Sequence, residues 1–131
     1  MKVFYNIDGL PKKVEKLNVI DLNQIPFKVK RLYYVTLGLG EHRGFHAHKN
    51  LRQFFICLSG TILFNLSTGL ETSEVVLTST SDGFLINQMV WREYKSLAAN
   101  SILLVLASDL YNESDYIRDF DEFRKYNHAI L

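Results

Sequence analysis

Three of the four histidines in this chain lie within seven residues, at positions 42, 46 and 48. Side chains alternate between the two faces of a β-strand, so His46 and His48 point to the same side. A neutral imidazole with a pKa of about 6.5 is suited to moving protons near neutrality. The pair therefore predicts acid–base chemistry. The alternative is a polar edge loop in which these histidines have no shared role.

The wider spacing favours a barrel interior. Two glycines, two histidines and a glutamine follow the first motif of the cupins, which are small double-stranded β-helix barrels: Gly40, His46, His48, Gln53 and Gly60. The usual acidic residue is replaced by Gln53, and no histidine lies between His48 and His128. Two imidazoles and a neutral amide are too few strong ligands for a tight metal site, although Glu93 could in principle add a carboxylate. We expect no metal, and a metal-dependent cupin such as a small dioxygenase is the alternative.

Length and composition indicate one domain. The chain has 131 residues, of which 47% are hydrophobic and 22% charged, as in ordinary globular proteins. The net charge of +1 argues against nucleic acid or a polybasic membrane surface as partner. Cys57 is the single cysteine, which excludes an intrachain disulfide and a cysteine-based zinc site.

Turn signals separate seven short apolar runs that predict β-strands, at 29–37, 53–58, 61–66, 74–77, 84–86, 90–94 and 102–107. This pattern indicates an all-β sandwich, jelly roll or barrel. Runs such as FFICL and ILLVL are apolar on both faces, which indicates that both faces are covered. From Asn112 onward, aromatic residues repeat at helical spacing, and we expect a C-terminal helix over about 113–126. The fold class is therefore an all-β cupin jelly-roll barrel with a C-terminal helix, in one domain over 1–131.

The sequence contains neither 18 consecutive apolar residues nor a signal-peptide pattern at its N-terminus, so we expect a cytoplasmic location and no membrane partner. It also lacks a glycine-rich dinucleotide fingerprint, so we expect no nicotinamide and no other cofactor.

Four blocks resemble a known family in order and spacing: KRLYYV at 30–35, RGFHAHK at 43–49, VWREY at 90–94 and VLASDLYNESDYIRDFDEF at 105–123. They are similar to the dTDP-4-keto-6-deoxyglucose 3,4-ketoisomerases, metal-free cupins that supply 3-amino-3,6-dideoxy sugars for bacterial glycans. The resemblance implies a dTDP-linked keto sugar as substrate and a homodimer that exchanges N-terminal strands. It also implies that His46 is the base, with His48 and Tyr34 beside it.

Further residues are assigned from their chemistry. Guanidinium groups bind oxyanions in pairs of hydrogen bonds, so Arg31 and Arg43 are candidates for the diphosphate. Gln53 is a candidate for hydrogen bonding to the sugar. In the family, the residue after the tryptophan is histidine or arginine, and the resemblance implies that Arg92 goes with the gluco configuration at carbon 4. The division of the family by product configuration also involves a second position, near the N-terminus, which falls near Lys12 or Lys13 in this chain.

Two further readings remain open. One alternative hypothesis is that the chain is a nucleotide-sugar-binding cupin without activity. The absence of a histidine at position 92 supports this hypothesis. A related cupin epimerase is the nearest enzymatic alternative, and it would invert carbons beside the ketone without moving the carbonyl. The RGxHxHK block fits the isomerases better.

Overall fold

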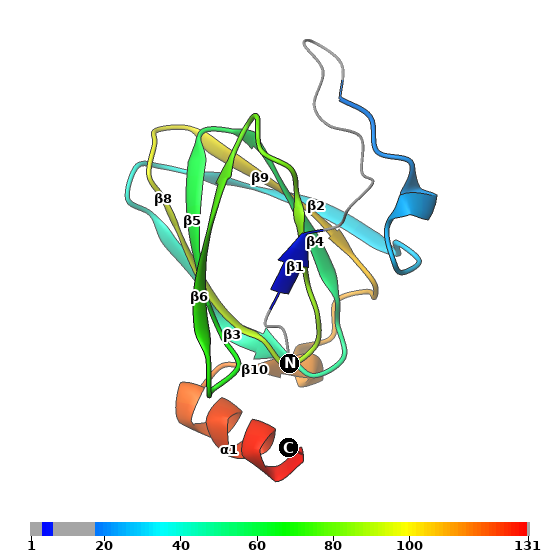
Figure 1. Cartoon of the computed structure of the whole chain (residues 1–131), viewed down its shortest axis with the longest axis vertical. Coiled ribbons are helices and arrows are strands. Elements are labelled where there is room, and N and C mark those ends of the chain that lie inside the picture. Colours follow the sequence, from blue (N-terminus) through cyan, green and yellow to red (C-terminus); the bar gives the residue numbers. More distant parts are fainter. Residues whose placement is uncertain (1–3, 7–17, 131) are drawn as a thin grey trace.

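Two five-stranded antiparallel sheets face each other in the computed structural model, which describes the backbone of residues 4–6 and 18–130 and the side chains of 18–127 (Figure 1). The first sheet has the order β1 (Phe4–Asn6), β7 (Phe84–Ile86), β4 (Gln53–Ser59), β9 (Ser101–Ala107) and β2 (Arg31–Leu37). The second has the order β10 (Tyr116–Ile117), β3 (His42–His48), β8 (Trp91–Ser96), β5 (Thr61–Ser67) and β6 (Thr72–Thr78). Two 3-10 turns, Leu22–Gln24 and Glu113–Asp115, and one helix, α1 (Phe120–Ile130), complete the described chain. The predicted all-β barrel with a C-terminal helix is confirmed.

The seven apolar runs correspond to β2 and β4–β9, but the sequence did not mark the full extent of β3. Its glycines resemble turn residues, yet the strand continues from His42 to His48 through a β-bulge between Gly44 and His46. Gly44 has φ 97° and Phe45 has φ 59°, both in the left-handed region. A Cβ at Gly44 would lie 2.8 Å from the carbonyl oxygen of Arg92, so β8 approaches too closely for any larger residue.

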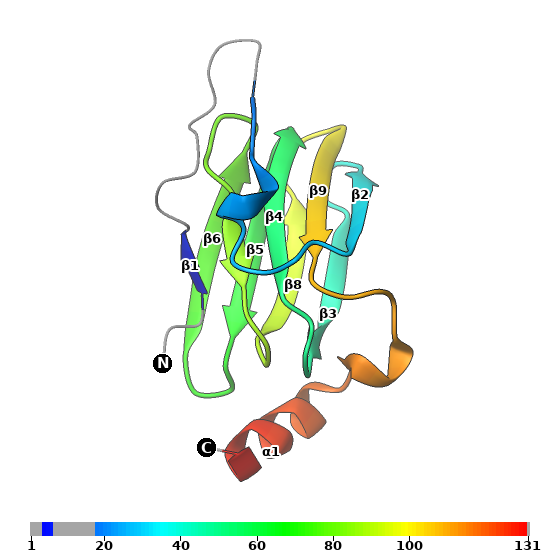
Figure 2. The same ribbon diagram turned by 90° about the vertical axis from the view of Figure 1, so that its right-hand side faces the viewer.

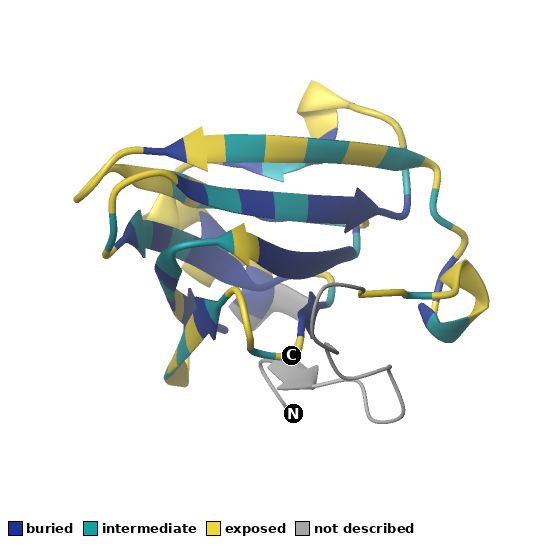
Figure 3. Ribbon diagram, turned by 90° about the horizontal axis from the view of Figure 1, so that it is seen from above, coloured by how far each residue is buried: buried dark blue, intermediate teal, exposed yellow. Residues whose placement is uncertain are grey.

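The core divides into an inner and an outer part. Inside the barrel, the rings of Phe55, Phe64 and Phe84 pack with centroids 5.0–5.4 Å apart. Outside β4, Phe54 packs against Ile25, Phe27 and other apolar residues of the segment before β2. This segment passes over β4 and β9 in Figure 2, and Figure 3 shows how burial is concentrated on the central strands. The prediction that FFICL is covered on both faces is confirmed for residues 54–57, whereas Leu58 at its end is 50% exposed.

The predicted helix over 113–126 is wrong at its start, because α1 begins at Phe120. Asn112 does cap a turn, but that turn is the three-residue 3-10 turn. The chain then extends as β10 and pairs with His48 and Ala47 of β3. A second cap follows at Asp119, whose carboxylate accepts a hydrogen bond from the first turn of α1 at 2.9 Å.

Helix α1 lies against one end of the barrel (Figure 1), where Phe123 packs against Trp91 and Ile117. Asn127 donates a hydrogen bond to the carbonyl oxygen of Thr68 in the turn between β5 and β6. No helix in the described part of the chain is both long enough and apolar enough to cross a membrane.

Candidate active site

The bulge in β3 sets the direction of the first histidine. His46 lies directly opposite Arg92 of β8, and directly opposed residues of an antiparallel pair share a face. Arg92 is 1% exposed and points into the barrel, so His46 points inward as well. Because Phe45 is the extra residue of the bulge, Arg43 also shares the inner face, opposite Tyr94.

The second histidine is held by the C-terminal segment. His48 is buried, and its Nδ1 lies 3.0 Å from Oδ2 of Asp115 in the 3-10 turn. The His46 and His48 rings are 4.8 Å apart, centroid to centroid. The Tyr116 ring of β10 packs on both, at 5.0 Å from His46 and 4.4 Å from His48. Arg118 covers the Tyr116 ring at 4.1 Å.

A polar chain crosses the barrel between the two sheets. Arg92 of the second sheet donates a hydrogen bond to the side-chain oxygen of Gln53 in the first sheet. The amide nitrogen of Gln53 donates to the Tyr33 hydroxyl at 2.9 Å. Arg92 also donates to the carbonyl oxygen of Val90 from Nε at 3.3 Å and from Nη2 at 3.0 Å. These contacts fix the Arg92 guanidinium and leave the Tyr33 hydroxyl hydrogen available to donate elsewhere.

The surroundings favour uncharged histidines. Burial, with the Arg92 guanidinium close by, lowers the pKa of His46 to about 4. Burial and Arg92 also hold the pKa of His48 far below its usual value. Burial lowers the pKa of Arg92 to about 10, so its charge persists at neutral pH. At neutral pH the site therefore combines two neutral imidazoles with one fixed positive charge.

The hydrogen bonds also define the tautomers. The Nδ1 of His46 lies 2.9 Å from the carbonyl oxygen of Gly44, which can only accept a hydrogen bond. The Nδ1 of His46 therefore carries the proton, and its Nε2 has a free lone pair. The same argument applies to His48, because both oxygens of the Asp115 carboxylate already accept backbone hydrogen bonds, from Asn50 and Leu51. Both rings thus offer Nε2 as a base.

A hollow of about 520 Å³ opens at this end of the barrel, between the start of β2 and the segment 109–116. Arg31, His48, Tyr111 and Tyr116 are among the residues that line it. Two buried side-chain nitrogens, Nε of Arg31 and Nε2 of His48, have no hydrogen-bond partner among the described residues. Buried polar atoms are nearly always paired, so these two indicate a place prepared for polar ligand atoms.

The structure does not bring every predicted residue to this place. Tyr34 was expected beside the histidines, but it lies on the outer face of β2 and is 68% exposed. Its neighbour Tyr33 shares the inner face with Arg31 and bonds Gln53 instead. Strict alternation along β2 decides between the two tyrosines, and Arg31 two residues earlier was the signal for Tyr33. Arg43 faces inward, but its side chain is half exposed and its Nε pairs with Glu41 at 3.2 Å.

Sequence reasoning missed the residues from the C-terminal segment. Asp115 and Tyr116 were placed in the first turn of a helix, where an acidic residue needs no other role. The strand pairing of Tyr116 with His48 brings both to the histidines. Only a prediction of β10 would have shown this, and a two-residue strand leaves no periodic signal. Lys12 and Lys13, near the second position that divides the family, lie outside the described residues.

Within the described residues, no group of three or more His, Cys, Asp or Glu side chains is arranged to hold a metal ion. The expectation that the site works without metal or cofactor stays a prediction.

Comparison with known proteins adds the family. A family model named FdtA and described as "WxcM-like, C-terminal" matches residues 2–128. The chain belongs to this family. Among curated proteins, TDP-4-oxo-6-deoxy-α-D-glucose-3,4-oxoisomerase of Aneurinibacillus thermoaerophilus is 44% identical over 103 residues, which are 78% of this chain and 74% of that protein.

Solved structures of sugar 3,4-ketoisomerases agree with the fold. A mutant of the 3,4-ketoisomerase QdtA from Thermoanaerobacterium thermosaccharolyticum, in complex with TDP-4-keto-6-deoxyglucose, has a TM-score of 0.89 at 34% identity and covers 98% of this chain and 96% of its own. The TDP-quinovose 3,4-ketoisomerase WlaRB from Campylobacter jejuni has a TM-score of 0.85 at 35% identity, covering 95% and 99%. The predicted cupin barrel and the resemblance to the sugar 3,4-ketoisomerases are confirmed, and the chain is a member of this enzyme family.

Proposed function

We propose that this chain moves the keto group of TDP-4-keto-6-deoxyglucose from carbon 4 to carbon 3. The observation that carries the proposal is the pair of imidazoles, the half-buried His46 and the buried His48, whose ring centroids are 4.8 Å apart and whose Nε2 atoms are each free to act as a base. The named activities of the relatives support the same reaction. A protein that only binds nucleotide sugars gains nothing from a second such base.

The reaction follows from elementary carbonyl chemistry. A ketone at carbon 4 acidifies the hydrogen at carbon 3, and the neutral Nε2 of His46 takes that proton. The resulting enediolate receives the proton at carbon 4, while the hydroxyl proton passes from the oxygen on carbon 3 to the oxygen on carbon 4. The carbonyl has then migrated without net oxidation or reduction. Arg92 and the Tyr33 hydroxyl provide positive charge and a hydrogen bond for the developing oxyanion.

The substrate-binding residues are assigned from buried polar groups that lack a hydrogen-bond partner in the described chain. The Nε of Arg31 is buried without a partner in the described chain, and Arg31 lines the hollow beside His48. We assign Arg31 to the diphosphate, with Arg43 as a second, more exposed candidate. Gln53 is already bonded to Arg92 and Tyr33, so its contribution is to hold these two groups in place for the sugar.

The deciding experiment is proton NMR of TDP-4-keto-6-deoxyglucose incubated with the protein. Migration of the carbonyl gives a 3-keto sugar, and the ring coupling constants report the configuration at carbon 4. Inversion at carbons beside an unmoved ketone would identify an epimerase instead. An unchanged substrate that nevertheless binds would identify a binding protein.

The finer proposal is a gluco product, a precursor for 3-amino-3,6-dideoxy sugars. It rests on Arg92, which is fully buried beside His46 and fixed by Gln53 and Val90. Arg92→His should shift the product toward galacto or give a mixture, while calorimetry with TDP shows little change. Weakened TDP binding with unchanged stereochemistry would contradict this role.

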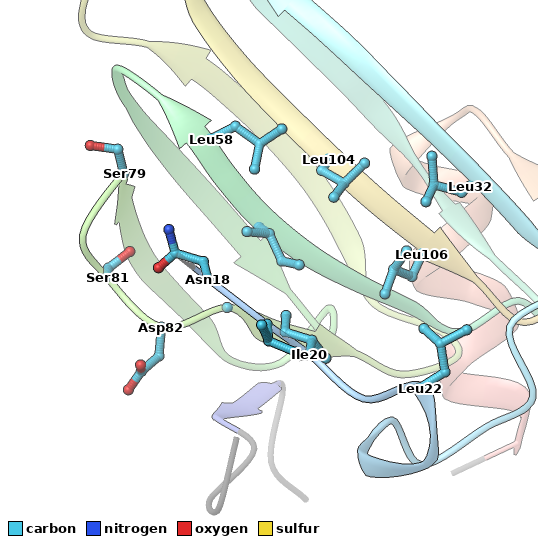
Figure 4. Close-up of a pocket in the computed structure, with 13 residues that line it drawn as sticks. Asn18, Ile20, Leu22, Leu32, Leu58, Ser79, Ser81, Asp82, Leu104 and Leu106 are labelled. Carbon is cyan, nitrogen blue, oxygen red and sulfur yellow. The ribbon is translucent and has the colours of Figure 1, made fainter. Parts of the chain in front are cut away.

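We also propose that the protein works as a homodimer through the outer face of the first sheet. A hollow of about 340 Å³ lies on this face. Apolar residues of β2, β4, β9 and the segment 18–22 line it, together with the turn at 79–83 (Figure 4). Leu32 is 59% exposed and Leu58 50%, although both belong to regular strands. Covering such a face stabilises a complex by roughly 25 cal/mol per Å² of apolar surface.

Light scattering tests the dimer. The wild type should have twice the mass of the chain, and Leu58→Asp should shift it toward the monomer. The control is Leu39→Asp, because Leu39 is 72% exposed but lies in the turn after β2. A monomeric wild type would contradict the proposal, as would equal loss of mass in both variants. The exchange of N-terminal strands stays a prediction; in the single chain, β1 pairs with its own β7.

A further inference from the structure

We propose that Asp115 is a positioning residue that holds His48 in the Nδ1–H tautomer, so that Nε2 of His48 carries the hydroxyl proton of the substrate between its two oxygens. This inference rests on the proposed ketoisomerase activity and adds a second, separately positioned base to it. It starts from one contact, in which Nδ1 of the buried His48 lies 3.0 Å from Oδ2 of Asp115.

Asp115 is itself firmly placed. Its side chain is about nine-tenths buried and accepts backbone hydrogen bonds from Asn50 at 2.7 Å and Leu51 at 3.3 Å. Its carbonyl oxygen accepts another from Lys49 at 3.0 Å. Both oxygens of Asp115 thus act as acceptors, Oδ1 for Asn50 and Oδ2 for Leu51, and a carboxylate only accepts hydrogen bonds. The proton between the two side chains therefore resides on Nδ1 of His48.

The other ring nitrogen is left available. The two nitrogens of an imidazole point in widely different directions, so Nε2 of His48 faces away from Asp115. It is buried and has no hydrogen-bond partner in the described part of the chain. A histidine with a purely structural role would be expected to use both nitrogens. His48 uses one to be oriented and keeps the other free at the hollow that it lines with Arg31.

The two histidines are oriented by different kinds of partner. The carbonyl oxygen of Gly44 holds His46, whereas a carboxylate holds His48. A carboxylate stabilises an imidazolium that forms on its partner more strongly than a neutral carbonyl does. The carboxylate of Asp115 therefore opposes the effect of burial and Arg92, which disfavour a proton on His48, during the transfer between two oxygens.

The proton balance includes a second transfer that such a carrier can perform. Migration of the carbonyl moves one proton from carbon 3 to carbon 4 and another from the oxygen on carbon 3 to the oxygen on carbon 4. His46 accepts and returns the first. Nε2 of His48 accepts the second from the hydroxyl on carbon 3, and the imidazolium then releases it to the oxygen on carbon 4. Both rings end neutral, and no other reactant is consumed.

Asp115→Asn tests the assignment with little change in shape. The amide oxygen at the Oδ1 position can still accept from the backbone of Asn50, and the NH₂ group at the Oδ2 position faces Nδ1 of His48 and gives up the 3.3 Å bond from Leu51. The ring must then place its proton on Nε2, which becomes a donor. We expect kcat to fall by about 10²–10⁴-fold, the range for loss of a correctly protonated base, with KM little changed. Nitrogen-15 NMR of histidine-labelled protein should show the proton of His48 moving from Nδ1 to Nε2.

The matched control is Ser108→Ala. Ser108 is 9% exposed, and its hydroxyl accepts a backbone hydrogen bond from Arg52 at 2.9 Å, so it anchors a neighbouring turn without contacting His48. This variant should keep its kcat. Equal losses of kcat in both variants would reduce Asp115 to a structural role. Full activity of Asp115→Asn, or an unchanged His48 tautomer in it, would overturn the proposal.

The two proposals fail separately. The tautomer of His48 is measured in the resting protein and does not need turnover. If the wild type does not move the carbonyl but Asp115→Asn still changes the tautomer, the proposed reaction is wrong and the positioning by Asp115 stands. If the wild type is active and Asp115→Asn is equally active, only the role of Asp115 is wrong.

Discussion

The two parts of the barrel interior differ in how completely their buried groups are packed and paired. In the apolar part, Phe64 packs against Phe55, Phe84 and Tyr94 with ring centroids 5.0–5.2 Å apart. At the polar end, buried histidine, arginine and glutamine side chains occupy the same kind of position, and two nitrogens have no partner in the described chain. Burying a polar atom without a partner costs roughly 1–3 kcal/mol. The aromatic part therefore provides the stability that allows the polar end to stay reactive.

The largest effect should follow from removing the base at the polar end. His46→Asn should lower kcat by about 10²–10⁴-fold while the melting temperature changes little, because the amide is a smaller polar group and His46 is only half-buried. Product formation by NMR and thermal unfolding by circular dichroism check this on one preparation. Near wild-type turnover in the folded variant would remove His46 as the base.

The opposite profile is expected in the aromatic part. Phe64→Ala leaves a cavity among three other rings and should reduce the free energy of unfolding by about 3–5 kcal/mol. At a temperature where the variant is folded, its kcat should stay close to that of the wild type. Urea unfolding and kinetics at 10 °C measure the two quantities. A large loss of kcat in the fully folded variant would show that the two parts are not separable.

A smaller effect should distinguish the adjacent tyrosines. Tyr33→Phe removes an inward hydroxyl at the polar end, and the loss of one hydrogen bond of about 1.5 kcal/mol corresponds to a roughly tenfold lower kcat. Tyr34→Phe changes an exposed side chain on the outer face and should leave kcat unchanged. Steady-state kinetics of both variants test the strand register. A reversed order would mean that Tyr34 reaches the site after all.

The smallest effect is expected from pH. His46 must be neutral to act as a base, and burial with Arg92 nearby lowers its pKa to about 4. The kcat/KM value should therefore stay nearly constant from pH 7 to pH 5 and fall only as the pH approaches 4. With the ordinary pKa of about 6.5, the value would already have fallen roughly thirtyfold at pH 5. A profile with that steeper fall, in protein shown to be folded by circular dichroism, would contradict the buried environment of His46.

Much of this arrangement could be predicted from residue patterns. The apolar runs gave the strands, and the spacing of His46 and His48 gave their common face. The start of α1 could not be predicted, because Asn112 and Asp119 are both valid caps and only strand pairing decides between them. The local sequence pattern also does not predict contacts between elements that are far apart in the chain.

The choice between Tyr33 and Tyr34 shows the same limit at the site. Two tyrosines in a row fit either face of β2, and the choice depends on which face meets the other sheet. Asp115 lies 67 residues from His48, so no local pattern links the two. The composition of a site whose residues come from different elements is therefore the feature that is hardest to predict from sequence.

The bulge at Gly44 and Phe45 separates two kinds of sequence change in β3. Phe45 is 45% exposed, so its side chain is dispensable, and glycine would adopt its φ of 59° without strain. The presence of one extra residue at this position of β3 is required, whatever its side chain. Deleting it would restore simple alternation and turn the part of β3 on one side of it by half a rotation. Relatives are then free to vary the amino acid at this position but not the length of the segment, and an alignment gap there would mark a protein with a different inner face.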